Sequence, residues 1–92
     1  MDIEIVNQNK NEIELRIKNE DIAFFNLVIN LANSKKETEF AAIKKADNLE
    51  KEFSLYIRSS GKAAKDILLT CISEAEESLL NIVSDLKKSL PK

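Results

Sequence analysis

The last third of the chain repeats apolar residues at alternating steps of four and three, and this repeat constrains the fold most. It predicts a helix from about Ala63 to Ser89, ended by Pro91. A helix of about 27 residues spans ~40 Å, whereas a typical strand spans only ~20 Å. We therefore expect the distal half to extend past its own sheet and to lie against another helix. The apolar seam consists of Leu68, Ile72, Ala75, Leu79, Ile82, Val83, Leu86 and Leu90, and Ile67, Leu69 and Cys71 widen its start.

Three other segments have the alternation of strands. In residues 12–18, Ile13, Leu15 and Ile17 alternate with charged residues, which indicates one face on a core and one in water. A short strand is expected at Ile3 to Val6, and the polar residues 7–11 predict a turn that makes the two strands a hairpin. The alternation returns in residues 53–58 and ends at Ser59-Ser60-Gly61.

Residues 22–32 predict a first helix, with Asp21 as its N-cap. Only Asn26 and Asn30 interrupt its apolar run, so a sheet would cover one side and something else must cover the other. Adjacent helix positions diverge by about 100°, so Phe24 and Phe25 cannot easily share one sheet and one of them is expected to reach a partner. Asn26 is expected to be buried or interfacial because its neighbours are apolar.

Residues 35–51 are ambiguous. Their alanine, glutamate and lysine content favours helix, but residues 39–43 could equally form a strand, and Asp47-Asn48 is typical of a turn.

Length and composition argue against several classes of function for this chain. The chain has 92 residues and a net charge of −2 with no basic stripe, so we expect a single domain over residues 1–92 that does not bind nucleic acid directly. It has no histidine, one glycine and one cysteine, which argues against histidine-based catalysis, glycine-rich phosphate loops and an internal disulfide. We expect no cofactor and no metal, a cytoplasmic location and no transmembrane helix.

Two further groups of residues have side chains that can do chemistry, but the sequence favours a structural role for each. The carboxylates of Glu74, Glu76 and Glu77 are close in sequence, but without histidine or a pocket motif they predict a solvated helix face. Cys71 is expected to be a small buried hydrophobe, because no basic cluster in the sequence would activate its thiol.

Short motifs resemble the archaeal RNA polymerase subunit L family, whose relatives include the dimerisation portion of bacterial subunit α. Where that family has a pattern close to G-E-D-H-T-L-G-N-L, residues 19–27 read N-E-D-I-A-F-F-N-L, with Glu20, Asp21, Asn26 and Leu27 matching. The next family pattern, F-A-x-Y followed by H-P-L, is matched at Phe40, Ala41 and Leu49, with Asp47-Asn48 in place of His-Pro. A third family pattern consists of a strand, then T-x-G, a short segment with proline, and A-L. Residues 57–61 and 66–68 follow this pattern, but the proline is missing.

The resemblance and the periodicities together predict an α+β fold in the order strand, strand, helix, strand, strand, helix. We expect a two-layer arrangement, with a four-stranded, mainly antiparallel sheet carrying two helices on one face, and Thr38 to Lys44 as a strand. The resemblance implies a non-catalytic assembly subunit of RNA polymerase that forms a heterodimer with a D-like chain, helices facing helices, as a platform for the large catalytic subunits. The expected partner-binding residues are Phe24, Phe25, Asn26, Leu27, Val28, Leu31, Ile72, Leu79, Ile82, Val83, Leu86 and Leu90.

Two alternatives stay open. The chain could be a free-standing module of similar fold that homodimerises or competes for a polymerase partner. Phe25 stands where the family has glycine, so it is expected at the interface, and the alternative is a Phe25 that faces the core.

Overall fold

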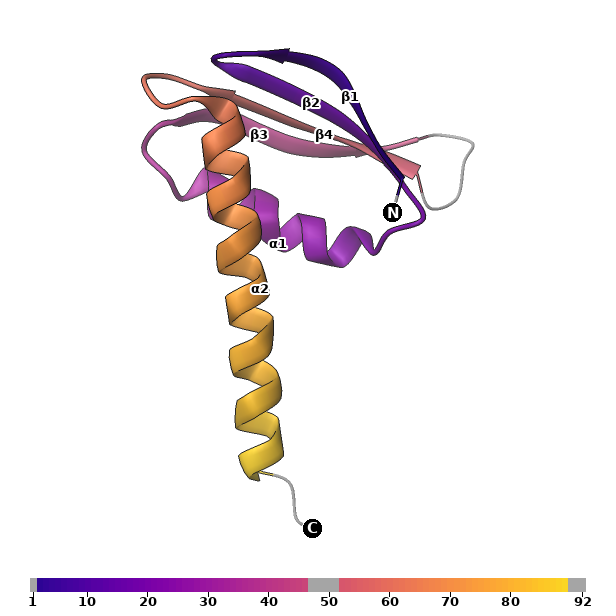
Figure 1. Ribbon diagram of the computed structural model, residues 1–92, viewed down its shortest axis with the longest axis vertical. Coiled ribbons are helices and arrows are strands. Elements are labelled where there is room, and N and C mark those ends of the chain that lie inside the picture. Colours follow the sequence, from indigo (N-terminus) through magenta and orange to yellow (C-terminus); the bar gives the residue numbers. More distant parts are fainter. Residues whose placement is uncertain (1, 47–51, 90–92) are drawn as a thin grey trace.

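The structure, a computed structural model, describes residues 2–46 and 52–89. Its elements follow the expected order (Figure 1): β1 (Asp2–Asn9), β2 (Glu12–Lys18), α1 (Ile22–Asn33), β3 (Thr38–Lys45), β4 (Glu52–Ser59) and α2 (Ala64–Ser89). The predicted turn at Asp47-Asn48, the matched Leu49, the seam residue Leu90 and the helix-ending Pro91 lie outside the described residues.

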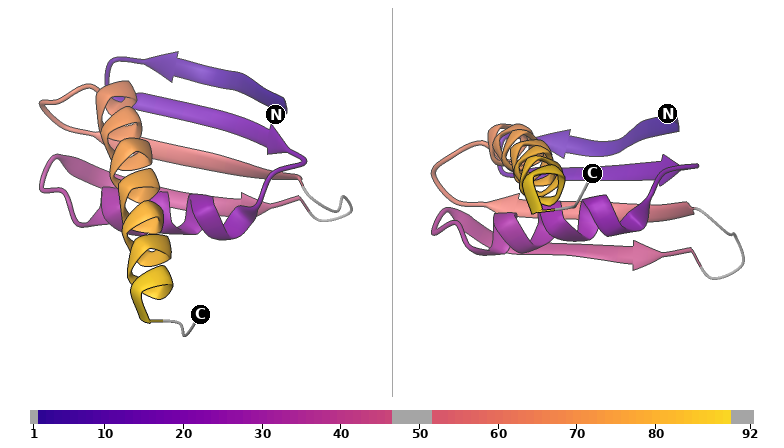
Figure 2. Two further views of the ribbon diagram at one scale, coloured as in Figure 1. Left: turned by 60° about the horizontal axis from the view of Figure 1, so that its bottom comes forward. Right: turned by 90° about the horizontal axis from the view of Figure 1, so that it is seen from below.

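The sheet has the order β1-β2-β4-β3, and every neighbouring pair of strands is antiparallel. Both helices lie on one face of it (Figure 2), so the expected two-layer α+β architecture is confirmed. Apolar pairs across β2 and β4 form the centre of the core: Ile13 opposite Ile57, Leu15 opposite Leu55, and Ile17 opposite Phe53, all buried.

β3 forms a strand although its composition favours helix. Its partner is β4, with Ala41 opposite Ile57 and Ile43 opposite Leu55. Ala41 is buried and Ile43 packs against the core, so the pairing places these two side chains of β3 on the helix-covered face. Ladder hydrogen bonds and this burial together outweigh a propensity of a few tenths of a kcal/mol per residue.

β1 is longer than the expected strand at Ile3 to Val6. It continues to Asn9, and only Lys10 and Asn11 form the turn, so the expected polar turn over residues 7–11 is wrong in length. A bulge between Ile5 and Asn7 adjusts the register, after which Asn9 pairs with Glu12. The Asn9 side chain accepts a hydrogen bond of 3.0 Å from the backbone N–H of Asn11, which closes the tight turn.

Local backbone interactions fix the first turn of each helix. The Asp21 carboxylate accepts a hydrogen bond of 2.9 Å from the N–H of Ala23, as the predicted N-cap requires. Before α2, Gly61 adopts a φ of 85°, which a residue with a side chain rarely takes. The N–H of Ala64 then donates a 2.9 Å hydrogen bond to the backbone oxygen of Lys10, which anchors the first turn of α2 to the β1–β2 turn.

Candidate protein-interaction surface

The helix α2 has a buried proximal half and an exposed distal half. Its buried residues are Ala64, Ile67, Leu68, Cys71 and Ala75, which pack on the sheet and on α1. Every residue from Leu79 to Ser89 is exposed, and we call this segment the distal arm. Figure 1 shows α2 crossing the sheet and continuing well beyond both the sheet and α1, as the length of the predicted helix required.

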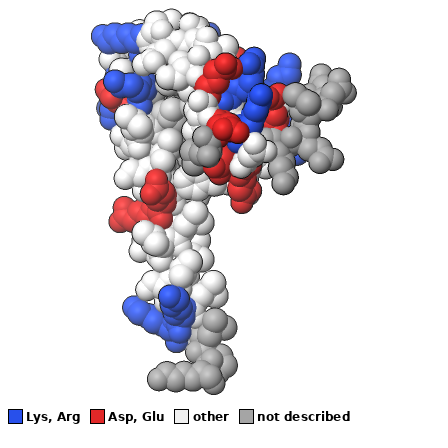
Figure 3. All heavy atoms as spheres, turned by 45° about the vertical axis from the view of Figure 1, so that its right-hand side comes forward, with Lys and Arg blue, Asp and Glu red and all other residues white. Residues whose placement is uncertain are grey.

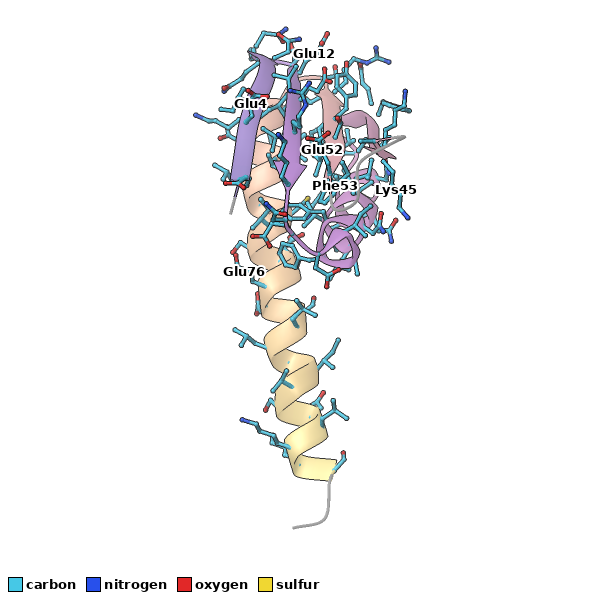
Figure 4. The ribbon with its side chains drawn as sticks, turned by 90° about the vertical axis from the view of Figure 1, so that its right-hand side faces the viewer. Glu4, Glu12, Lys45, Glu52, Phe53 and Glu76 are labelled. Carbon is cyan, nitrogen blue, oxygen red and sulfur yellow. The ribbon has the colours of Figure 1, made fainter. Side chains whose placement is uncertain are left out.

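The distal arm carries five large apolar side chains in water. These are Leu79, Leu80, Ile82, Val83 and Leu86, with exposed fractions from 43% at Leu79 to 69% at Leu80. Figure 4 shows the arm as a bare helix with side chains projecting into solvent, and Glu76 lies close to where it leaves the body of the molecule. A contiguous exposed apolar patch of this kind is typical of a protein–protein contact.

An ion pair holds α2 at the point where it leaves α1. The Nζ of Lys35, just after α1, lies 2.8 Å from each carboxylate oxygen of Glu74. The hydrogen bond to Glu74 raises the pKa of Lys35 above its ordinary value. Lys35 and Glu74 are both partly exposed, so the pair adds little to overall stability but restrains the direction of the helix.

The two long sides of α1 differ in polarity. Asn26, Asn30 and Asn33 share an exposed stripe, and the Asn33 amide donates a 3.1 Å hydrogen bond to the backbone oxygen of Ala41 in the edge strand β3. Asn26 is therefore exposed in this chain and not buried. Helical spacing places a second set of side chains on the flank away from this edge, half-buried against the core. This set consists of Phe24, Leu27 and Leu31.

Phe25 and Val28 are core residues of this chain. Phe25 is 4% exposed and its ring centroid lies 5.5 Å from that of Phe53, while Val28 is fully buried. The ring of Phe24 meets Phe25 edge-on with centroids 5.2 Å apart. Of the two adjacent phenylalanines, Phe25 thus faces the sheet and Phe24 lies at the flank. The structure does not bring Phe25 or Val28 to the surface, in contrast to the expected partner-binding set, and the core-facing alternative for Phe25 is the arrangement found.

The helix-side face of β1 is uncovered, which the sequence did not predict. Ile3 and Ile5 lie opposite Ile17 and Leu15, so their side chains point to the same face of the sheet as the core. They are nevertheless 45% and 58% exposed, because α1 lies over β3 and α2 over β2 and β4. In the sequence, the alternation of Ile3 and Ile5 with acidic residues indicates that both side chains point to the same face of the sheet. It does not indicate that this face is exposed at β1.

Metal-ligating side chains do not gather in the part of the chain that the structure describes. Across residues 2–46 and 52–89, no cluster of three or more His, Cys, Asp or Glu side chains could hold a metal ion. Within the same ranges, none of the helices is long and apolar enough to cross a membrane. Cys71 is free and buried, and its burial raises the pKa of the thiol.

The state of Cys71 leads to a prediction about its reactivity. At neutral pH we expect native protein to react with an aromatic disulfide reagent about a hundredfold more slowly than urea-unfolded protein, because the thiolate is the reactive form and the native thiol is protonated and enclosed. The release of the coloured thiol, followed by absorbance, measures both rates. Equal rates in the two states would contradict the buried position of Cys71.

The fold and the surface define a two-layer α+β protein with a projecting, apolar C-terminal helix. A solved structure with this fold is DNA-directed RNA polymerase subunit L from Thermoplasma acidophilum, with a TM-score of 0.81 over 96% of this chain and 87% of that chain. The two sequences are 10% identical, so this likeness concerns the fold. No protein-family model matches the sequence, and no curated protein matches it.

Proposed function

We propose that this chain is an assembly subunit of a DNA-directed RNA polymerase and forms a heterodimer with a D-like chain of that enzyme. The observation that carries the proposal is the distal arm, a helix with an exposed apolar stripe that the other described residues, 2–46 and 52–78, leave uncovered. The shared fold with a polymerase subunit L and the motif resemblance at residues 19–27 point to the same kind of complex.

The proposed contact surface runs along α2 and onto the facing flank of α1. Leu79, Ile82, Val83 and Leu86 would form its centre, since they are exposed and share one side of the helix. Ile72 lies on the same side closer to the sheet and is half-buried against the core. The half-buried flank of α1 would border the contact, and Leu90 would extend the stripe by sequence. Asn26, on the other long side of α1, would join the contact only where the partner also covers the outer surface of α1.

In this proposal residues 1–92 form one dimerisation domain that works in the cytoplasm. The heterodimer would present a platform on which the large polymerase subunits assemble, and the nucleotidyl transfer itself would take place on those chains. This chain would contribute an apolar contact area and a matching surface shape to the heterodimer, because helix–helix contacts of this kind gain most of their energy from buried apolar side chains.

Co-purification tests the proposal. The chain carrying an affinity tag, expressed in the cells that naturally produce it, should recover a D-like chain and the large polymerase subunits in equal molar amounts by quantitative mass spectrometry. The recovered complex should also elongate RNA on a primed template. Recovery of the tagged chain at native abundance without any other polymerase chain would contradict the proposal.

A further inference from the structure

Four of the five large apolar side chains of the distal arm, all except Leu80, are arranged symmetrically along the helix. Ile82 and Val83 flank a midpoint, and Leu79 and Leu86 each lie the same number of residues from it. The spacing of these four residues is therefore the same from either end of the helix. A second copy of the arm laid antiparallel about a two-fold axis at this midpoint places Leu79 opposite Leu86 and Ile82 opposite Val83, so each copy covers the apolar stripe of the other.

From Glu74 onward the charges of α2 have the opposite arrangement, with one sign predominating on each side of the midpoint. Glu74, Glu76 and Glu77 precede it, and Lys87 and Lys88 follow it. Figure 3 shows this separation, with acidic atoms partway along the helix and basic atoms close to its end. An antiparallel copy brings the acidic part of each helix beside the basic part of the other, whereas a parallel copy brings like charges together. Asp85, close to the midpoint, is the exception.

One charged pair lies where it can contact the second copy. Glu76 and Lys87 are eleven residues apart, which is about three helical turns, so they lie on the same flank of the apolar stripe. In an antiparallel two-fold pair the same flanks face each other, and Glu76 of one copy comes beside Lys87 of the other at both ends of the contact. Glu76 also borders a shallow hollow on the arm, of about 280 Å³, together with Leu79, Leu80 and Val83.

We infer that in the free protein the distal arm is covered by a second copy of this chain, lying antiparallel and aligned by the Glu76–Lys87 pairs. This inference rests on the pattern of α2 and not on the polymerase assignment. Only a few large side chains per copy take part, so the contact buries less than the ~1,200–2,000 Å² of a standard stable interface. The dimer is therefore reversible, with a dissociation constant in the micromolar range.

Sedimentation equilibrium of the full chain across a wide concentration range tests the inference. The expected result is a monomer–dimer equilibrium that ends at two copies, because a two-fold contact uses up both apolar stripes. Glu76→Lys and Lys87→Glu should each weaken the dimer about tenfold, since each replaces two attractive pairs by repulsive ones. The double variant with both changes in one chain should restore the dimer, and so should an equimolar mixture of the two single variants.

A matched control separates pairing from net charge. Glu77→Lys makes the same change of charge as Glu76→Lys, but Glu77 lies on the side of the helix opposite the stripe, so its dimer should be unaffected. Circular dichroism checks that all variants keep their helix content. A chain that stays monomeric at every concentration, a double variant as weak as the single ones, or a Glu77→Lys variant as weak as Glu76→Lys would each overturn the inference. Failure to recover polymerase subunits from cells would leave these results unchanged.

Discussion

An aspartate at Leu79 or Leu86 is expected to abolish pairing with the D-like chain and to leave the fold of the monomer intact. Both side chains are about half exposed in the monomer, so the new charge remains hydrated there. In the complex the same charge would be buried without a partner, which should cost about 3 kcal/mol or more, equivalent to a loss of over a hundredfold in affinity.

Leu68→Asp should fail in a different way. Leu68 is 4% exposed and lies in the proximal half of the same helix, in the core. A chain of this size has a total stability of roughly 5–13 kcal/mol, and an unpaired buried charge removes much of it. We expect Leu68→Asp to be largely unfolded by circular dichroism. Leu79→Asp and Leu86→Asp should show native spectra and, at concentrations where the native chain is monomeric, native melting temperatures.

Asn81→Asp is the matched control for the two distal variants. It introduces the same carboxylate into the exposed distal arm, but on the side of the helix away from the apolar stripe, so it should bind the D-like chain normally. Binding is measured by titration of the purified partner with each variant. Equal unfolding of Leu68→Asp, Leu79→Asp and Leu86→Asp would show that α2 cannot be divided into a core half and an interface half.

Truncation of Phe25 is expected to give the second large effect, and to act on the fold. Phe25→Ala removes a buried ring that packs between Phe24 and Phe53, which typically destabilises a protein by about 3–5 kcal/mol. The urea midpoint of unfolding should fall accordingly. In the sequence, Phe25 stands where the resembled family has glycine, which predicted an interface role. On that prediction, truncation of Phe25 would mainly weaken binding to the partner. The core position of Phe25 transfers the expected loss to the monomer.

Phe40 provides the control for Phe25. It is 47% exposed on the helix-free face of the sheet, with its ring 5.9 Å from that of Tyr56, so Phe40→Ala should cost about 1 kcal/mol or less. If Phe25→Ala left the urea midpoint unchanged and weakened binding to the D-like chain, Phe25 would be an interface residue after all.

The two halves of α2 would have separate roles if the proposed function holds. The proximal half is packed against the sheet and α1, and the Lys35–Glu74 ion pair restrains the direction in which the helix leaves. The distal arm would then project in a restrained direction from the packed part of the molecule. A partner helix could thus meet a surface whose position is already set, which reduces the ordering cost of binding.

Periodicity in the sequence was enough to predict the elements with strong patterns. The alternation at residues 12–18 predicted β2, the apolar run after Asp21 predicted α1, and the seam predicted α2 with its overshoot. These predictions succeeded because side-chain direction in a helix or strand follows directly from residue spacing. The length of α2 also indicated that its distal half would lack a partner within the chain, since a helix of that length exceeds the width of a small sheet.

Tertiary structure decided the features that depend on neighbours far along the chain. β3 is a strand because β4 pairs with it, although its local composition favours helix. Phe25 is in the core and Phe24 at the flank because the rotation of α1 on the sheet selects one of two equally apolar neighbours. Ile3 and Ile5 are uncovered because the two helices lie over the other three strands. In each case the local pattern allows both outcomes, and the long-range contact that distinguishes them exists only in the folded chain.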